Sequence, residues 1–112
     1  MKIEVAGKVF TIQFVDNWKL VTHDPDNCPR HAAEIHWVTS NIRVDDSRDI
    51  SSVEISLWHE VIHAITDSLK IRELMDEDGN CLEIPTDQLA VGIASVLKSV
   101  GLSLVRAVKN AE

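Results

Sequence analysis

The chain has 112 residues, of which 45% are hydrophobic and 26% are charged, and a formal net charge of −7 at pH 7. We expect a single domain over residues 1–112, because this length supports one modest core and the composition is that of ordinary folded proteins. The acidic balance argues against nucleic-acid binding, which needs a basic surface. The sequence has neither an apolar run of about 18 residues nor a signal peptide, so it predicts a cytoplasmic protein that does not associate with membranes.

Two strand pairs are predicted in the first 45 residues. Residues 2–15 alternate as a hairpin that turns at Gly7 and Lys8. The alternation places Ile3 and Val5 on one side before the turn, and Val9, Thr11 and Phe14 on the returning strand. Residues 16–30 are rich in Asn, Asp and Pro and indicate a loop. Residues 34–38 and 40–44 are predicted to form the second pair.

The chain also contains scattered residues of types that can bind metals. Cys28 and Cys81 are too few to define a disulfide framework and are predicted to be free thiols. Cys28 and His31 have the spacing of half a structural zinc site, but no second pair completes it. We therefore expect ordinary packing or surface roles for His23, His31 and His36, although one of them could approach a metal site elsewhere.

A helix is predicted from Ser51 to about Lys70. Ser51 is the expected N-cap and Glu54, three residues later, completes a capping box. No Gly or Pro interrupts the segment. Its apolar residues occupy most of the helix circumference, as a buried central helix requires; they are Leu57, Trp58, Val61, Ile62, Ala64, Ile65 and Leu69.

This helix carries the motif His59-Glu60-Val61-Ile62-His63. Two histidines four residues apart project from one helix face, one turn apart, and can share one metal ion. Glu60 lies beside the open coordination position, where it can act as a general base toward a water that the metal activates. The sequence therefore predicts Zn²⁺ as cofactor, His59 and His63 as ligands and Glu60 as the catalytic residue.

A third protein ligand is expected downstream, because a catalytic zinc site usually has three. Between the helices, residues 75–80 are predicted to form an exposed turn rather than a calcium loop. Glu83 begins the next acidic segment, twenty residues after His63, and Asp87 follows four residues later. Pro85 favours the first turn of a helix and Thr86 is a plausible N-cap, so Glu83 can precede the helix and Asp87 can be the third ligand instead.

A last helix is predicted from about Thr86, ended by Gly101 and followed by a short tail. Its core-facing stripe is expected to contain apolar residues at three- and four-residue steps: Leu89, Ile93, Val96, Leu97, Val100 and Leu104.

The spacing from the motif to Glu83 and Asp87 resembles that of the thermolysin-like gluzincins. By this resemblance Glu83 is the zinc ligand, and Asp87 hydrogen-bonds His59 and fixes the tautomer and the orientation of its ring. The order of the strand pairs, the motif helix, Glu83 and Leu89-Ala90-Val91-Gly92-Ile93-Ala94 resembles the small phage- and prophage-encoded metallopeptidases. The resemblance implies an α+β, minimal zincin-like fold, in which a small N-terminal antiparallel or mixed sheet packs on the motif helix and a C-terminal helix. It also implies that a strand beside the zinc helix holds the substrate by edge pairing.

The predicted function is zinc-dependent hydrolysis of a peptide bond in a peptide or protein substrate of narrow or unknown specificity, in a phage-related setting. The chain contains no Tyr, so the phenolic donor of many gluzincins is missing, and His36, a backbone amide or a water must stabilise the oxyanion. The alternative is a zinc-stabilised binding or regulatory module with little or no proteolytic activity. Retention of Glu60 favours the enzyme, since a structural site has no need of this carboxylate.

Overall fold

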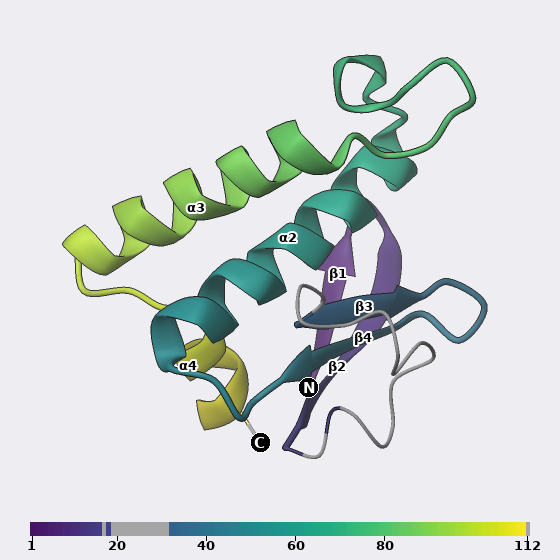
Figure 1. Cartoon of the computed structure of the whole chain (residues 1–112). Helices are drawn as coiled ribbons and strands as arrows, with labels where there is room; N and C mark the ends of the chain where they lie inside the picture. The colour runs from purple at the N-terminus through teal and green to yellow at the C-terminus, as the bar shows by residue number, and fades with distance from the viewer. Residues whose placement is uncertain (17, 19–31, 112) are drawn as a thin grey trace.

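The computed structural model describes residues 1–16, 18 and 32–111. The fold is α+β, as predicted: a four-stranded mixed sheet precedes three helices (Figure 1). The elements are β1 (Lys2–Val5), β2 (Lys8–Val15), β3 (Ala33–His36), β4 (Asn41–Asp45), α2 (Ile50–Leu69), the short 3-10 helix η2 (Arg72–Leu74), α3 (Glu83–Ser99) and α4 (Leu104–Asn110). The predicted loop over residues 16–30, with His23 and Cys28, lies almost entirely outside the described residues, as does His31.

The sheet has the strand order β1-β2-β4-β3. The central pair β2 and β4 is parallel, and each of the other two pairs is antiparallel. Both strand pairs predicted from the sequence are therefore present, and β1 and β3 form the two edges of this sheet.

The hairpin between β1 and β2 turns one residue earlier than predicted. Ala6 and Gly7 occupy the turn with φ of 49° and 86°, the positive values that a two-residue hairpin turn of the I′ type requires. Val5 consequently pairs with Lys8. A shift of one residue moves a strand's side chains to the opposite face, so Phe10 is fully buried while Val9 is 51% exposed.

The helices form two further layers on the sheet (Figure 1). Helix α2 packs across one face of the sheet, and α3 lies against α2 on the side away from the sheet. The main core fills the space between the sheet, α2 and α4. Its fully buried large side chains include Phe10, Ile42, Val44, Leu57 and Val108.

Helix α3 does not bury the stripe that its sequence predicts. Its buried residues are the small side chains Thr86, Ala90 and Ala94, which permit close approach to α2. Leu89 is 44% exposed and Val96 is 64% exposed. Because α3 packs mainly on α2 among the described elements, only a narrow face of α3 is covered, and the small residues occupy that face.

Helix α2 spans the predicted range, but its cap differs from the prediction. Asp49 is the N-cap, and its carboxylate accepts hydrogen bonds from the Ser52 amide and hydroxyl. Glu54 forms no capping box. It is buried at 7% exposure, and its carboxylate accepts hydrogen bonds from the amides of Leu104 and Val105 at the start of α4.

The segment after Gly101 is a helix rather than the predicted tail. Gly101 has a φ of 77°, which ends α3 and redirects the chain. Ser103 then caps α4 by accepting from the Arg106 amide. The turn at residues 75–80 forms as predicted, closed by a bridge between Met75 and Cys81.

No single helix in the described ranges is long and apolar enough to cross a membrane. Helices α3 and α4 would reach that length and composition only together, and they meet at an angle of 71°.

Candidate metal centre

The two histidines of the motif lie on one face of α2, one turn apart. Their rings stack, with centroids 4.7 Å apart and an interplanar angle of 28°. The Nε2 atoms of His59 and His63 are 3.0 Å from each other. The four-residue spacing thus aims two potential ligand atoms at one point.

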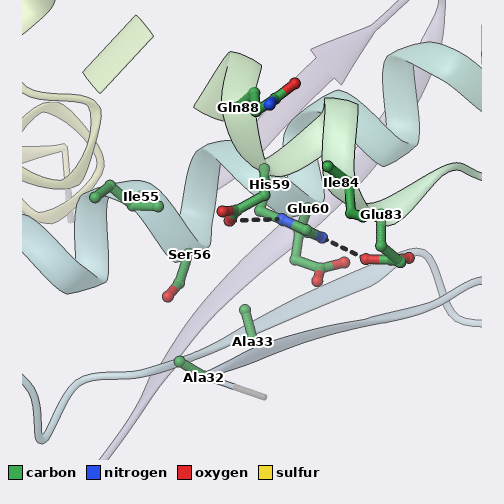
Figure 2. A pocket seen from close by; sticks show the side chains of 10 residues that line it. Ala32, Ala33, Ile55, Ser56, His59, Glu60, Glu83, Ile84 and Gln88 are labelled. Carbon is green, nitrogen blue, oxygen red and sulfur yellow. Dashed lines mark hydrogen bonds and ion pairs between the residues drawn. The ribbon is translucent and has the colours of Figure 1, made fainter. Parts of the chain in front are cut away.

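Glu83 reaches the same point from α3. Its Oε2 atom lies 2.8 Å from Nε2 of His59 and its Oε1 atom lies 3.3 Å from Nε2 of His63 (Figure 2 shows the contact with His59). Among the residues that the structure describes, these three form the only group of His, Cys, Asp or Glu side chains close enough to share a metal ion.

The start of α3 explains why the Glu83 carboxylate lies beside the two Nε2 atoms. The helix begins at Glu83, so this residue lies on the first turn, with Pro85 in the same turn. Thr86 is inside the helix rather than its N-cap: its amide and hydroxyl both donate to the Leu82 carbonyl, at 3.3 and 2.6 Å. The helix therefore starts three residues before the predicted position.

Hydrogen bonds alone do not satisfy this cluster. A neutral imidazole Nε2 is either a donor or an acceptor. Suppose that Glu83 is ionised. If Nε2 of His59 carries a proton, Nε2 of His63 and the Glu83 carboxylate are two acceptors in contact. If Nε2 of His63 carries it, Nε2 of His59 and the Glu83 carboxylate are in the same position. Protons on both rings place two donors 3.0 Å apart. A cation between the three groups makes every contact favourable, since each then offers a lone pair.

Asp87 lies one helical turn after Glu83 and approaches the other side of the His59 ring. Its Oδ1 atom is 3.4 Å from Nδ1 of His59. A carboxylate at Nδ1 favours the tautomer with the proton on that nitrogen, which leaves Nε2 free as a ligand. In the arrangement of the structure, Glu83 faces both Nε2 atoms and Asp87 faces only Nδ1.

Burial changes the proton affinities of two groups in the centre. Glu60 is 9% exposed, and desolvation of its carboxyl raises the pKa to about 7, with His59 opposing and Glu83 and Glu34 adding to the increase. Burial lowers the pKa of His63, partly offset by the nearby Glu83 carboxylate. The lowered pKa favours the neutral imidazole of His63, which is the form that can bind a metal ion, and a carboxyl that titrates near 7 can accept and release a proton at neutral pH.

A cavity of about 510 Å³ is lined by His59, Glu60, Glu83 and Asp87 of this centre. Figure 2 shows Ala32 and Ala33, at the start of edge strand β3, across from His59 and Glu60. Ile84 and Gln88 of α3 line the same cavity, together with Ile55 and Ser56 of α2. No sequence motif marks these lining residues, because they become neighbours only when α3 folds back along α2.

His36, predicted as a possible oxyanion donor, is the last residue of β3 and does not line this cavity. Its Nδ1 atom lies 2.7 Å from the Thr39 hydroxyl in the following turn.

No family model, no curated protein and no solved structure matches this chain.

Proposed function

We propose that the chain is a zinc-dependent peptidase, with His59, His63 and Glu83 as the metal ligands and Glu60 as the general base. The observation that carries this proposal is the convergence of two imidazoles and a carboxylate beside a buried fourth group, Glu60, at the wall of an open cavity. Zinc holds nitrogen and oxygen ligands at about 2.0–2.1 Å in a tetrahedron, which spaces them about 3.3 Å apart. The three contacts here measure 2.8, 3.0 and 3.3 Å.

When bound, zinc would polarise the substrate carbonyl and lower the pKa of the attacking water. Glu60 takes the proton of that water and delivers it to the leaving amine. Its pKa of about 7 suits both transfers, because a group titrating near the working pH accepts and releases a proton readily. Asp87 holds the His59 ring in the ligating tautomer.

The edge of the sheet supports a peptide as substrate. Strand β3 is an edge strand, and Ala33 at its start lines the cavity opposite the ligands. An extended peptide can add to such an edge by backbone hydrogen bonds, with its scissile bond in front of the metal. The small side chains of Ala32 and Ala33 leave room for the substrate backbone. The phage-related setting and the cytoplasmic location remain proposals that rest on the sequence resemblance and composition.

The test compares the wild-type protein with Glu60→Gln, both loaded with zinc, on a library of peptides made by digesting a cell proteome. We expect new peptide ends with the wild type and none above background with Glu60→Gln. Glu73→Gln is the matched control, since it removes an equal charge from an exposed position in η2 and should cleave normally.

Equal cleavage by wild type and Glu60→Gln contradicts the proposed role of Glu60. Zinc binding without any Glu60-dependent cleavage favours a metal-stabilised binding module, the alternative that the sequence also allows.

A further inference from the structure

A second cavity, of about 330 Å³, lies beyond the candidate metal centre. It is enclosed by the first half of α2, the second half of α3 and the start of α4, which meet at one end of the molecule (Figure 1). Its apolar wall contains Ile50, Ile55, Val91, Ala94 and Leu102. Ile55 also lines the first cavity, so the two cavities are neighbours, and α2 and α3 border both of them.

The charges of this second cavity are basic. Lys98 and Arg106 line it, and within the described ranges neither cation has a carboxylate at ion-pair distance. Two such cations on one cavity are notable in a chain with a net charge of −7.

The one acid in the wall of the second cavity, Glu54, forms no ion pair with Lys98 or Arg106 in the described part of the chain, so the lining has two positive charges and one negative charge. Its carboxylate accepts hydrogen bonds from the Ser103 hydroxyl, the amides of Leu104 and Val105, and the Trp58 indole. The donors of α4 therefore occupy its oxygens, and Lys98 and Arg106 remain available to an anion from outside.

The two cavities thus differ in charge. Glu60, Glu83 and Asp87 line the first cavity, whereas Lys98 and Arg106 line the second. Lys98 lies fifteen positions after Glu83 on α3, which corresponds to roughly 22 Å along the helix axis. An extended peptide at about 3.3 Å per residue covers this distance with about seven residues.

We propose that the second cavity is a remote subsite, which binds an acidic side chain and an adjacent apolar side chain of the substrate about seven residues from the cleaved bond. The inference rests on the proposed peptidase function, because the bound segment is taken to be part of a substrate. Binding of that segment can be measured without cleavage. Carboxylate recognition by Lys98 and Arg106 supplies the charge selectivity, and the wall around Val91 and Leu102 buries the apolar neighbour.

The first test uses the peptide library with the wild type and the double variant Lys98→Glu/Arg106→Glu. In wild-type cleavage products we expect Asp and Glu to be enriched about seven residues from the new end, on one side only. The double variant should lose this enrichment while it still cleaves. Lys2→Glu/Arg72→Glu has the same change in net charge at exposed positions outside both cavities, and should keep the enrichment.

The second test measures binding without catalysis. Zinc-loaded, ¹⁵N-labelled Glu60→Gln protein is titrated with the blocked tetrapeptide Leu-Asp-Glu-Leu and with its neutral twin Leu-Asn-Gln-Leu. We expect only the acidic peptide to shift the amide signals of Ala94, Ser95 and Leu102. Lys98→Glu/Arg106→Glu in this background should weaken its binding by about tenfold or more, as loss of about 1.4 kcal/mol would.

Ser95→Trp tests independently whether the peptide binds in the second cavity, since Ser95 is exposed and lines that cavity. The added ring should obstruct the subsite and weaken the acidic peptide without any change in charge. Thermal melting of each variant verifies that the protein remains folded.

The outcomes for the subsite and the peptidase are separable. Library products without acidic enrichment, or enrichment that persists in Lys98→Glu/Arg106→Glu, overturn the remote subsite even if Glu60-dependent cleavage is present. If no cleavage occurs, the proposed function fails and the titration decides: equal binding of both tetrapeptides, or binding of neither, overturns the subsite.

Discussion

Asp87 and Glu83 contact opposite nitrogens of the same ring: Oδ1 of Asp87 lies 3.4 Å from Nδ1 of His59, and Oε2 of Glu83 lies 2.8 Å from Nε2. The two acids are therefore expected to differ in their effect on the metal. Asp87→Asn should weaken zinc affinity by roughly tenfold, as loss of a partner behind a ligating histidine does. Glu83→Gln should weaken it much more, because a ligand is lost. Competition with a zinc-binding dye measures both affinities, and the reverse order would make Asp87 the third ligand.

Zinc content provides a direct test of the motif. We expect about one zinc per chain in wild-type protein after zinc supplementation, and none in His59→Ala or His63→Ala, because each loses one of the two Nε2 ligand atoms. Elemental analysis after desalting measures this ratio. His36→Ala should bind normally, since His36 contacts Thr39 and lies outside the site cavity. A wild-type protein that stays empty contradicts the site assignment.

Removal of the metal should also lower stability. An ion that binds only the folded chain stabilises it by an amount that grows with its concentration relative to Kd, about 2.7 kcal/mol at 100 times Kd. Thermal melting with and without a chelator should therefore show a lower Tm for the metal-free protein. His63→Ala should show no such difference, and an identical shift in this variant would mean that the metal acts elsewhere.

Glu54 is expected to be a major determinant of stability. Its buried carboxylate satisfies the first amides of α4, where both the hydrogen bonds and the helix dipole favour a negative charge. Glu54→Ala should reduce the free energy of unfolding by about 2–4 kcal/mol, because buried donors lose a charged acceptor. Chemical denaturation measures the loss, and Glu73→Ala at an exposed site should change little. A value for Glu54→Ala within 0.5 kcal/mol of wild type would show that water replaces the carboxylate.

The environment of Asp45 predicts that the free energy of unfolding decreases at acidic pH. Burial alone would raise the pKa of this carboxyl, but hydrogen bonds from the Ser47 hydroxyl and amide, together with Arg48, lower it below its ordinary value of 3.8. A folded-state pKa below the unfolded value stabilises the protein above the unfolded pKa, and this contribution disappears as the pH falls through the folded pKa.

The corresponding variant is Asp45→Asn, which should lose about 1–2 kcal/mol at pH 7. The difference from wild type should shrink progressively below about pH 4. Urea unfolding at several pH values measures it, and a difference that is independent of pH would assign the effect to packing.

The sequence alone determined the local parts of this protein. Both strand pairs and the range of α2 follow from periodicity and from turn residues, which act over a few positions. The α+β class was implied by the family resemblance. The motif in α2 likewise predicted that His59 and His63 share one face, because helix geometry requires it. The spacing to Glu83 indicated a third ligand through a family resemblance, although local signals placed the helix start at Thr86.

Tertiary structure decided which faces and partners these elements use. Helix α3 buries Ala90 and Ala94 rather than its larger apolar residues, because α2, its main neighbour among the described elements, requires close approach. Glu54 satisfies amides fifty residues away instead of its own helix start, where Asp49 is available. The approach of Glu83 to both histidines depends on α3 folding back along α2, and a contact of such long sequence separation leaves no periodic signal in the chain.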